Sequence, residues 1–232
     1  MSELMPGVFL VDGVSAPGRP GTVNVTLLVS GDGTATLVDA GFPGIAEPLS
    51  ATLDEAGISA GAVRRVIITH HHPDHTGGLP EVVAMTGADV WAHADDADLI
   101  DGTTPRQPPP GVPEGASKSL HGVKPAPVDL RLVGGEVLGV LGGCWLLHTP
   151  GHTPGHLSLY LPQLSLLIGG DILRYQDGLV TRAPEAYTAD AESNERSLRE
   201  LAKLEFERLL PYHGEFVGDG ASARMRRDLG LA

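Results

Sequence analysis

The sequence predicts a four-layer αββα sandwich, an α/β fold of two mixed β-sheets packed face to face with helices on the outer faces. First, 41% of the 232 residues are hydrophobic, which is enough to bury a substantial core. Second, strands followed by helices occur twice, once on each side of a Pro/Gly-rich stretch at about 101–128. Third, several strand-like runs end in His or Asp, so polar side chains gather at one end of the sheets. We expect a single domain over 1–232, built from two halves without a detectable sequence repeat.

The first half alternates β-rich runs with helical periodicity. A hairpin is expected where Ser30–Gly33 joins two strands, and a helix where Ile45, Leu49 and Leu53 recur at four-residue spacing. The expected elements are strands at 8–13 and within 23–41, a helix at 44–57, a strand at 64–70, a helix at 77–87, a strand at 88–93 and a short helix at 94–100.

The stretch at 101–128 lacks either periodicity and leaves two interpretations open. In the first interpretation it is an exposed connection between the halves. In the second it is a loop that partly covers the site, because long structureless loops in compact domains are often functional. Proteolysis with and without ligand discriminates between them.

The second half again begins with strands. Leu198, Leu201 and Leu204 are spaced for one buried helix face. The expected elements are strands at 129–133, 144–148, 157–161 and 164–170, a helix at 190–205, a strand at 206–214 and a last helix after Gly220. The stretch 177–190 is expected to shape the pocket.

Composition excludes several classes of function. Lys and Arg number 16 against 29 Asp and Glu, and the resulting net charge of −13 repels nucleic-acid phosphates and anionic membranes. The single Cys144 excludes an internal disulfide and a cysteine-built metal cluster, and we expect a small buried residue there. The N-terminal residues show no signal-peptide pattern, and no run reaches the roughly 18 apolar residues of a membrane span. We expect a cytoplasmic protein that acts on a small molecule, with neither nucleic acid nor membrane as a partner; its oligomeric state is not predicted.

The segment THHHPDHTGG carries four histidines and one aspartate within six positions. In extended backbone after a strand, alternate residues face the same way, so His70 and His72 are expected to point together while His71 turns away. The chain then bends, so that Asp74 and His75 aim at a neighbouring point. These donors suit two neighbouring divalent cations. The alternative is a surface histidine tract that binds metal loosely.

Three later stretches supply further candidate ligands. HTPGHTPGH places His148, His152 and His156 on a loop between two strands. LIGGDIL ends an apolar strand with Asp171, and LLPYHG ends another at His213. Packing poorly explains an aspartate at the end of an apolar strand, whereas a carboxylate that bridges two cations fits there.

In this order, these stretches resemble the motif set of the metallo-β-lactamase superfamily over residues 22–214, and VDAG with Asp39 is similar to its early motif. The resemblance implies the αββα metallo-β-lactamase fold and two divalent ions, for which Zn²⁺ is the best match and which iron or manganese also fits. By position, it implies a first ion on His70, His72 and His152, a second on Asp74, His75 and His213, and Asp171 as the bridge. It makes His71 a bystander, gives Asp39 a supporting role beside the ligands, and makes His148 and His156 either supporting or packing residues.

The implied reaction is hydrolysis. Two cations that share a water lower its pKa and polarise the oxygen under attack. A metal-bridging hydroxide would then cleave an ester, thioester, lactone or related bond, with Asp74 and Asp171 as catalytic residues. Tyr175, Tyr187 and Tyr212 are candidates to protonate the leaving group and equally candidates for packing. Substrate-binding residues are not identified.

Family members differ in what they cleave. The motifs are similar to those of glyoxalase II and of lactonases, but only residues 214–232 follow His213, so a full glutathione pocket is not expected. Arg224, Arg226 and Arg227 are expected on a solvated helix face. Ribonuclease Z-like activity conflicts with the net charge of −13. Lactam hydrolysis stays an alternative, although secreted β-lactamases carry an export signal.

Two further alternatives stay open. The chain also resembles persulfide dioxygenases, which use the same fold with one iron to oxidise sulfur substrates. The presence of Asp74, His75 and His213 favours two metals over one, and oxygen consumption with glutathione persulfide would discriminate. A metal-binding protein without catalysis would hydrolyse no ester or lactone in its holo form.

Overall fold

The computed structural model describes residues 3–15, 23–106 and 123–231. Its strands are β1 (Glu3–Met5), β2 (Val8–Leu10), β3 (Thr26–Val29), β4 (Ala35–Val38), β5 (Val63–Ile68), β6 (Asp89–His93), β7 (Leu130–Leu132), β8 (Val137–Leu138), β9 (Cys144–His148), β10 (Leu157–Leu161), β11 (Leu166–Gly170), β12 (Leu173–Gln176), β13 (Leu179–Arg182) and β14 (Arg208–Pro211). Its α-helices are α1 (Ala46–Ala56), α2 (Pro73–Thr76), α3 (Leu79–Thr86), α4 (Ala94–Asp101), α6 (Ala191–Leu201) and α7 (Ala221–Leu229).

Two large sheets mix parallel and antiparallel pairs, as predicted. The first has the order β1-β2-β3-β4-β5-β6-β7, antiparallel up to β4 and parallel from β4 to β7. The second has the order β14-β11-β10-β9-β8, in which the β11–β14 pair is parallel. Strands β12 and β13 form a separate hairpin. The parallel pairs position the site, because the carboxyl ends of parallel strands meet at one edge of a sheet.

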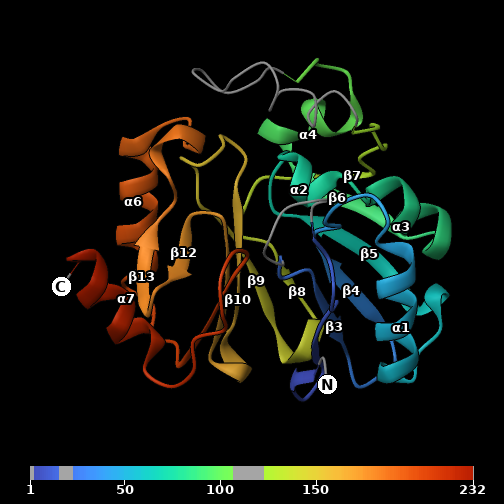
Figure 1. Ribbon diagram of the computed structural model, residues 1–232, viewed down its shortest axis with the longest axis horizontal. Helices are drawn as coiled ribbons and strands as arrows, with labels where there is room; N and C mark the ends of the chain where they lie inside the picture. Colours follow the sequence, from blue (N-terminus) through green and yellow to red (C-terminus); the bar gives the residue numbers. More distant parts are fainter. Residues whose placement is uncertain (1–2, 16–22, 107–122, 232) are drawn as a thin grey trace.

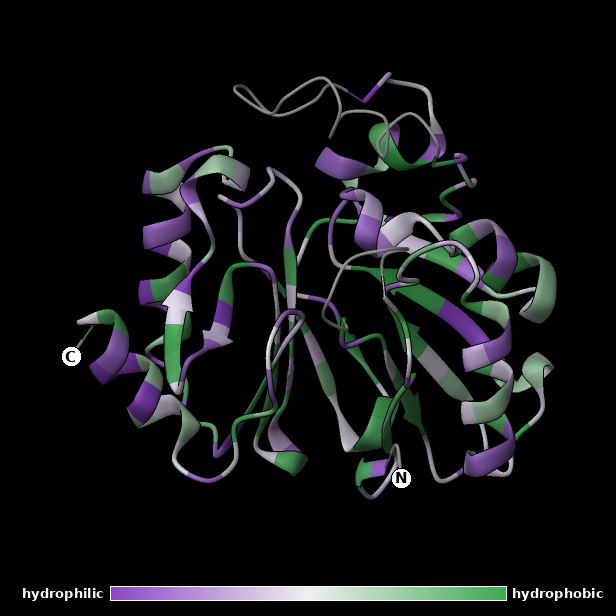
Figure 2. Cartoon of the chain, viewed as in Figure 1, coloured by the Kyte–Doolittle hydropathy of each residue, from purple (hydrophilic) through white to green (hydrophobic). Residues whose placement is uncertain are grey.

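Neighbouring residues on the central strands are buried on opposite faces of each sheet. Leu27 packs in the core under α1 and α3, and Leu28 packs in the core between the two sheets. On β14, Leu209 packs under α6 and α7, and Leu210 packs between the sheets. Three cores therefore separate four layers, which confirms the predicted αββα sandwich (Figure 1). Figure 2 shows mainly apolar residues on the strands and many polar ones on the outer helices.

One strand lies in a different sheet from the one that its sequence position indicated. The run at 129–133 was expected to open the second half, but β7 pairs in parallel with β6 at the edge of the first sheet. Asp129 explains this position, because its backbone N–H donates to the Val90 carbonyl and its carboxylate accepts from the Val90 N–H. An alternating pattern predicts a strand but not its partner. The pattern also did not predict the short elements β1, β8 and α2, or the β12–β13 hairpin.

The stretch at 101–128 is described only in part. Its residues 107–122 lie outside the described ranges, so both interpretations of it stay predictions. Within those ranges, none of the helices is both long and apolar enough to span a membrane.

Candidate metal centre

The predicted ligands converge because their strands end at one edge of the two sheets. His70 follows β5, Asp171 follows β11 and His213 follows β14. Strand β5 is parallel to its neighbour β4, and β11 is parallel to β14, so each pair delivers its following residues to the same edge. His72 precedes the short helix α2, whose first residue Pro73 suits a helix start.

Seven of the predicted residues form two compact groups. Within each group the possible ligand atoms all lie within 4.8 Å of one another. The three-histidine group consists of His70, His72 and His152, and the mixed group consists of Asp74, His75, Asp171 and His213. In the first group, His152 Nε2 and His72 Nδ1 are 3.0 Å apart.

Asp171 faces both groups. Its Oδ2 lies 3.3 Å from His213 Nε2 in the mixed group and 3.6 Å from His152 Nε2 in the three-histidine group. Its Oδ1 lies 3.5 Å from His75 Nε2. Asp74 Oδ2 completes the mixed group, 3.1 Å from His213 Nε2. One carboxylate thus stands between two sets of convergent nitrogen donors, which is the geometry of a bridging ligand.

The site contains buried polar atoms that the described residues leave without a hydrogen-bond partner. They include His70 Nε2, His75 Nε2 and Asp171 Oδ1, each of which points into the groups above. Leaving such an atom unpaired costs about 1–3 kcal/mol, and divalent cations held by the two groups would satisfy all three atoms. The donor set of five imidazoles and two carboxylates therefore fits metal ions.

The two groups differ in charge. In the three-histidine group, burial holds the pKa of His70 and of His152 well below the usual range, and burial with the neighbouring His71 lowers the pKa of His72 to about 3. These rings are neutral at pH 7 and present lone pairs.

In the mixed group, burial opposes charge on His75, but Asp39 and Asp74 together raise its pKa to about 10. Burial acts against ionisation of Asp74 too, but His75 and His213 lower its pKa to about 2. The pKa of Asp171 lies well below its usual range despite burial, because His213 and His75 stabilise the carboxylate.

Asp39 and Thr69 orient the rings of His70 and His75 through contacts with their Nδ1 atoms. Asp39 Oδ2 accepts from His75 Nδ1 at 2.8 Å and from the Thr69 hydroxyl at 2.8 Å, and Asp39 Oδ1 accepts from the Thr69 N–H. The Thr69 hydroxyl also lies 3.2 Å from His70 Nδ1. These contacts fix each ring by its Nδ1, which leaves Nε2 of His70 and His75 for a metal. The backbone of Asp39 has a φ of 62°, a region that residues other than glycine rarely adopt.

His156 supports Asp171 from the other side. Its Nε2 accepts from the Asp171 N–H at 3.0 Å, and its Nδ1 bonds the Thr149 hydroxyl at 2.8 Å. Gly170 permits this approach, because a Cβ there would lie 2.6 Å from His156 Nε2. Asp39 and His156 thus contact candidate ligands, and the supporting role expected for them stays a prediction.

His148 lies elsewhere. Its ring stacks on His93 with 3.9 Å between centroids, and its Nε2 donates to the Pro154 carbonyl at 2.8 Å. His148 is the last residue of β9, as in the expected strand at 144–148, and belongs to neither of the two ligand groups described above. With Asp95 the two rings form a third histidine–aspartate group. Because the two rings are stacked nearly in parallel, their lone pairs do not converge on one point.

Sequence reasoning missed several residues that hold the site. Asp96, on α4, accepts hydrogen bonds from His71, which itself belongs to neither ligand group. Tyr212 stacks on His75 at 3.6 Å between centroids and donates its hydroxyl to the Asp74 carbonyl. Asn24 donates to the carbonyls on both sides of Tyr212 and His213, those of Pro211 and Gly214. Asp96 and Asn24 belong to no motif, whereas Tyr212 stands beside His213 in LLPYHG, and all three act across a long sequence separation.

The structure distinguishes the three tyrosines that were candidates to protonate the leaving group. The hydroxyl of Tyr212 is buried, and its pKa is raised by burial and by Asp39, so it is not free to protonate a leaving group. The Tyr175 hydroxyl accepts from Arg224 at 2.7 Å, which also gives that arginine a partner within the fold. Tyr187 is 46% exposed and remains a candidate.

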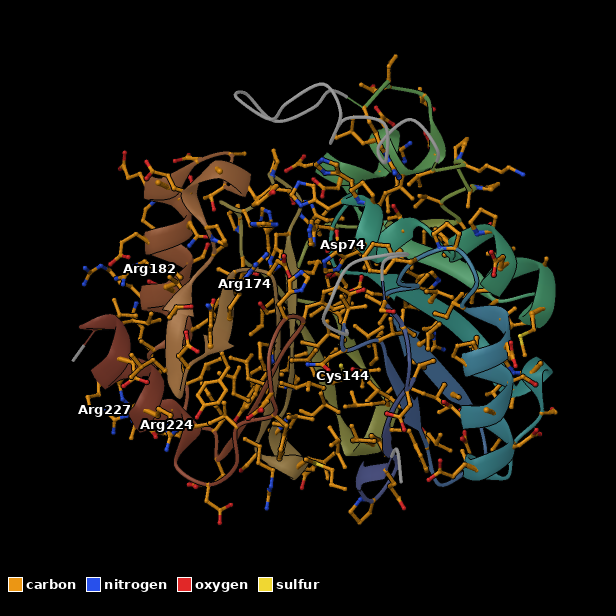
Figure 3. All side chains as sticks on the ribbon, in the orientation of Figure 1. Asp74, Cys144, Arg174, Arg182, Arg224 and Arg227 are labelled. Atoms are coloured by element: carbon orange, nitrogen blue, oxygen red, sulfur yellow. The ribbon has the colours of Figure 1, made fainter. Side chains whose placement is uncertain are left out.

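Cys144 and Arg174, both labelled in Figure 3, are relevant to the choice of nucleophile and to the charge of the site. Cys144 lies on β9 in the core between the sheets, well apart from Asp74, and burial raises its thiol pKa to about 12. It is the small buried residue that the sequence predicted. Arg174, on β12, brings Nη2 to 3.4 Å from Asp171 Oδ2 and places a cation beside the mixed group. Arg227 pairs with its neighbour Asp228 on α7 and is largely exposed.

Comparison with known proteins gives a consistent result. The profile of the metallo-beta-lactamase superfamily matches residues 18–213. The probable metallo-hydrolase YflN of Bacillus subtilis (strain 168) is 29% identical over 202 residues, which are 77% of this chain and 74% of that protein. A hydroxyacylglutathione hydrolase of Cereibacter sphaeroides is 28% identical over 83% of this chain, and the match spans 62% of that relative's length.

Solved structures share the architecture. A metallo-beta-lactamase family protein of Thermus thermophilus superposes with a TM-score of 0.76 at 28% identity, over 97% of this chain and 79% of that one. The metallo-beta-lactamase SMB-1, solved with mercaptoacetic acid, has a TM-score of 0.68 at 20% identity, over 97% of this chain and 92% of that one, a likeness of fold alone.

Proposed function

Because the chain belongs to the metallo-beta-lactamase superfamily, we propose that it is a binuclear metal-dependent hydrolase that cleaves an ester, thioester, lactone or related bond of a small molecule. The observation that carries the proposal is the position of Asp171 Oδ2. It lies 3.6 Å from His152 Nε2 of the three-histidine group and 3.3 Å from His213 Nε2 of the mixed group. A small-molecule substrate also suits the net charge of −13, which repels nucleic acid.

Each ion has its own ligand group in this proposal. The three-histidine group holds the first ion, the mixed group holds the second, and Asp171 joins them. Zn²⁺ suits five imidazoles and two carboxylates, and iron or manganese accepts the same donors. When bound, two such ions supply a water of lowered pKa and an electrophile for the oxygen under attack.

The protein's own residues supply the proton step. Asp74 is ionised at neutral pH, and its side chain is 24% exposed, whereas that of Asp171 is 3% exposed. Asp74 is therefore the more accessible of the two carboxylates, and beside its place in the mixed group it is the side chain that would accept a proton during hydrolysis. Asp171 keeps a fixed orientation because its N–H donates to His156.

Metal removal and reloading tests the proposal. The purified chain is stripped with a chelator, reloaded with Zn²⁺ and assayed on a lactone, a carboxylic ester, a hydroxyacylglutathione thioester, a β-lactam and a phosphodiester. We expect turnover of at least one probe, lost on stripping and restored by up to two equivalents of zinc.

Three results would contradict the proposal. Turnover that survives chelation would exclude a metal-dependent reaction. Oxygen uptake with glutathione persulfide, restored by one equivalent of iron, would replace hydrolysis with sulfur oxidation. A fully reloaded chain that turns over none of the probes would favour metal binding without catalysis.

A further inference from the structure

A buried carboxylate outside every motif connects the two loops that carry the three-histidine group. Asp96 lies on α4, which follows β6, and its side chain is 1% exposed. Its Oδ2 accepts from the His71 N–H and from His71 Nδ1, each at 2.9 Å. The same oxygen accepts from the Thr153 hydroxyl at 2.8 Å, and its Oδ1 accepts from the Gly155 N–H at 2.8 Å.

The partners of Asp96 are direct neighbours of the ligands. His71 stands between His70 and His72, and Thr153 follows His152. The loop after β5 and the loop between β9 and β10 belong to different sheets. The packing is also tight, because a Cβ on Gly155 would lie 2.7 Å from the Asp96 backbone nitrogen. Asp96 thus fixes the separation of two ligands from one half and the third ligand from the other.

We propose that Asp96 is a positioning residue for the three-histidine group and that it sets the affinity of this group for its metal ion. The inference rests on the proposed function, because it assumes that this group holds a cation. Asp96 is ionised, since burial raises its pKa by less than the hydrogen bonds from His71 and Thr153 lower it. A negative charge next to the donors strengthens each bond, and removal of such a partner behind metal ligands costs about 10–100-fold in metal affinity.

The mixed group is supported by other residues. Asp39 holds His75, Tyr212 holds Asp74 and His156 holds Asp171. Loss of Asp96 should therefore weaken the binding of the ion in the three-histidine group and leave the binding of the ion in the mixed group unchanged. A general loss of folding stability would weaken both, so the selectivity of the effect separates a positioning role from a structural one.

The test is a titration of metal-free protein with Co²⁺, followed by the visible absorption of the bound ion. His72→Ala and His213→Ala first assign each titration step to a group. For Asp96→Asn we expect the step of the three-histidine group to weaken by about 10–100-fold and its absorption spectrum to change. The step of the mixed group should stay within about threefold of wild type.

The matched control is Asp98→Asn on the same helix. Asp98 is exposed and pairs with Arg131, so neither titration step should change. If Asp96→Asn fails to fold, Thr153→Val removes one donor to Asp96 with little change of shape and should weaken the same single step by a smaller factor.

Two outcomes in folded variants would overturn the inference: equal weakening of both steps, or an unchanged three-histidine step in Asp96→Asn. A wild-type chain that binds no cobalt would overturn the proposed function itself, and this inference with it. If the wild-type chain binds two cobalt ions and Asp96→Asn weakens both steps equally, the inference alone is overturned.

Discussion

The two ligand groups lie side by side, yet the chain builds them from different chemistry. The three-histidine group consists of neutral imidazoles that burial keeps unprotonated, and Asp96 ties its two loops together. The mixed group pairs two imidazoles with two carboxylates, which raise the pKa of both rings and bring that of His75 to about 10. The first group is therefore ready for a cation at neutral pH, whereas in the second His75 must release a proton before it binds one.

The largest effect is expected where the two groups meet. Asp171→Asn removes the carboxylate that faces both of them, so both ions should bind more weakly. We expect kcat/KM of Asp171→Asn to fall about 1,000-fold, which corresponds to a loss of about 4 kcal/mol of transition-state stabilisation. Steady-state kinetics with metal analysis measures both effects. Asp177→Asn in the β12–β13 turn is the control, and a similar loss there would show that the effect is not specific to the site.

Asp39→Asn should produce the opposite selectivity to Asp96→Asn. It removes the charge that orients His75 by its Nδ1, so the mixed group should lose about 10–100-fold in affinity. The three-histidine group, which Asp39 reaches only through Thr69 and His70, should lose less. Calorimetric titration of both variants with Zn²⁺ measures this. If both variants weakened the same ion, the division of the site into two independently supported groups would be wrong.

The pH dependence of binding should differ between the groups. His75 has a pKa of about 10 in the metal-free protein, so below pH 10 a cation displaces at least one proton, and affinity falls about tenfold for each unit that the pH drops. His72 has a pKa of about 3 and is already neutral, so binding to its group should change little between pH 6 and 9. Calorimetry in buffers of different ionisation enthalpy counts the protons released at each step. Equal proton release at both steps would contradict the contrast.

The smallest effect is expected for Tyr212→Phe. The ring keeps its stacking on His75, but the hydrogen bond to the Asp74 carbonyl is lost. Urea unfolding should show a loss of about 1 kcal/mol, with metal content unchanged. Tyr187→Phe, at an exposed position, serves as the control and should leave stability unchanged. Loss of a metal ion from Tyr212→Phe would mean that its hydroxyl does more than fasten the backbone.

The sequence predicted the layers of the fold and the residues that gather in the two groups, but not all of the residues that contact those groups. Continuous apolar runs in β5 and β11 indicate buried strands, and the Asp of LIGGD marks the polar end of its strand, so local pattern suffices for these. Nothing local indicates that β7 joins the first sheet, because a strand's pattern does not name its partner. Asp96 is equally hidden, since its partners lie 25 to 59 residues away and only the folded chain brings them together. His148 follows the packing alternative that the sequence left open, because its ring stacks on His93.

The most direct test of the central claim is the metal content of the chain, by elemental analysis of protein purified without added metal or chelator. Two ligand groups joined by Asp171 predict about two divalent ions per chain, with zinc as the expected metal. About one iron per chain would contradict the binuclear account and transfer the assignment to sulfur oxidation.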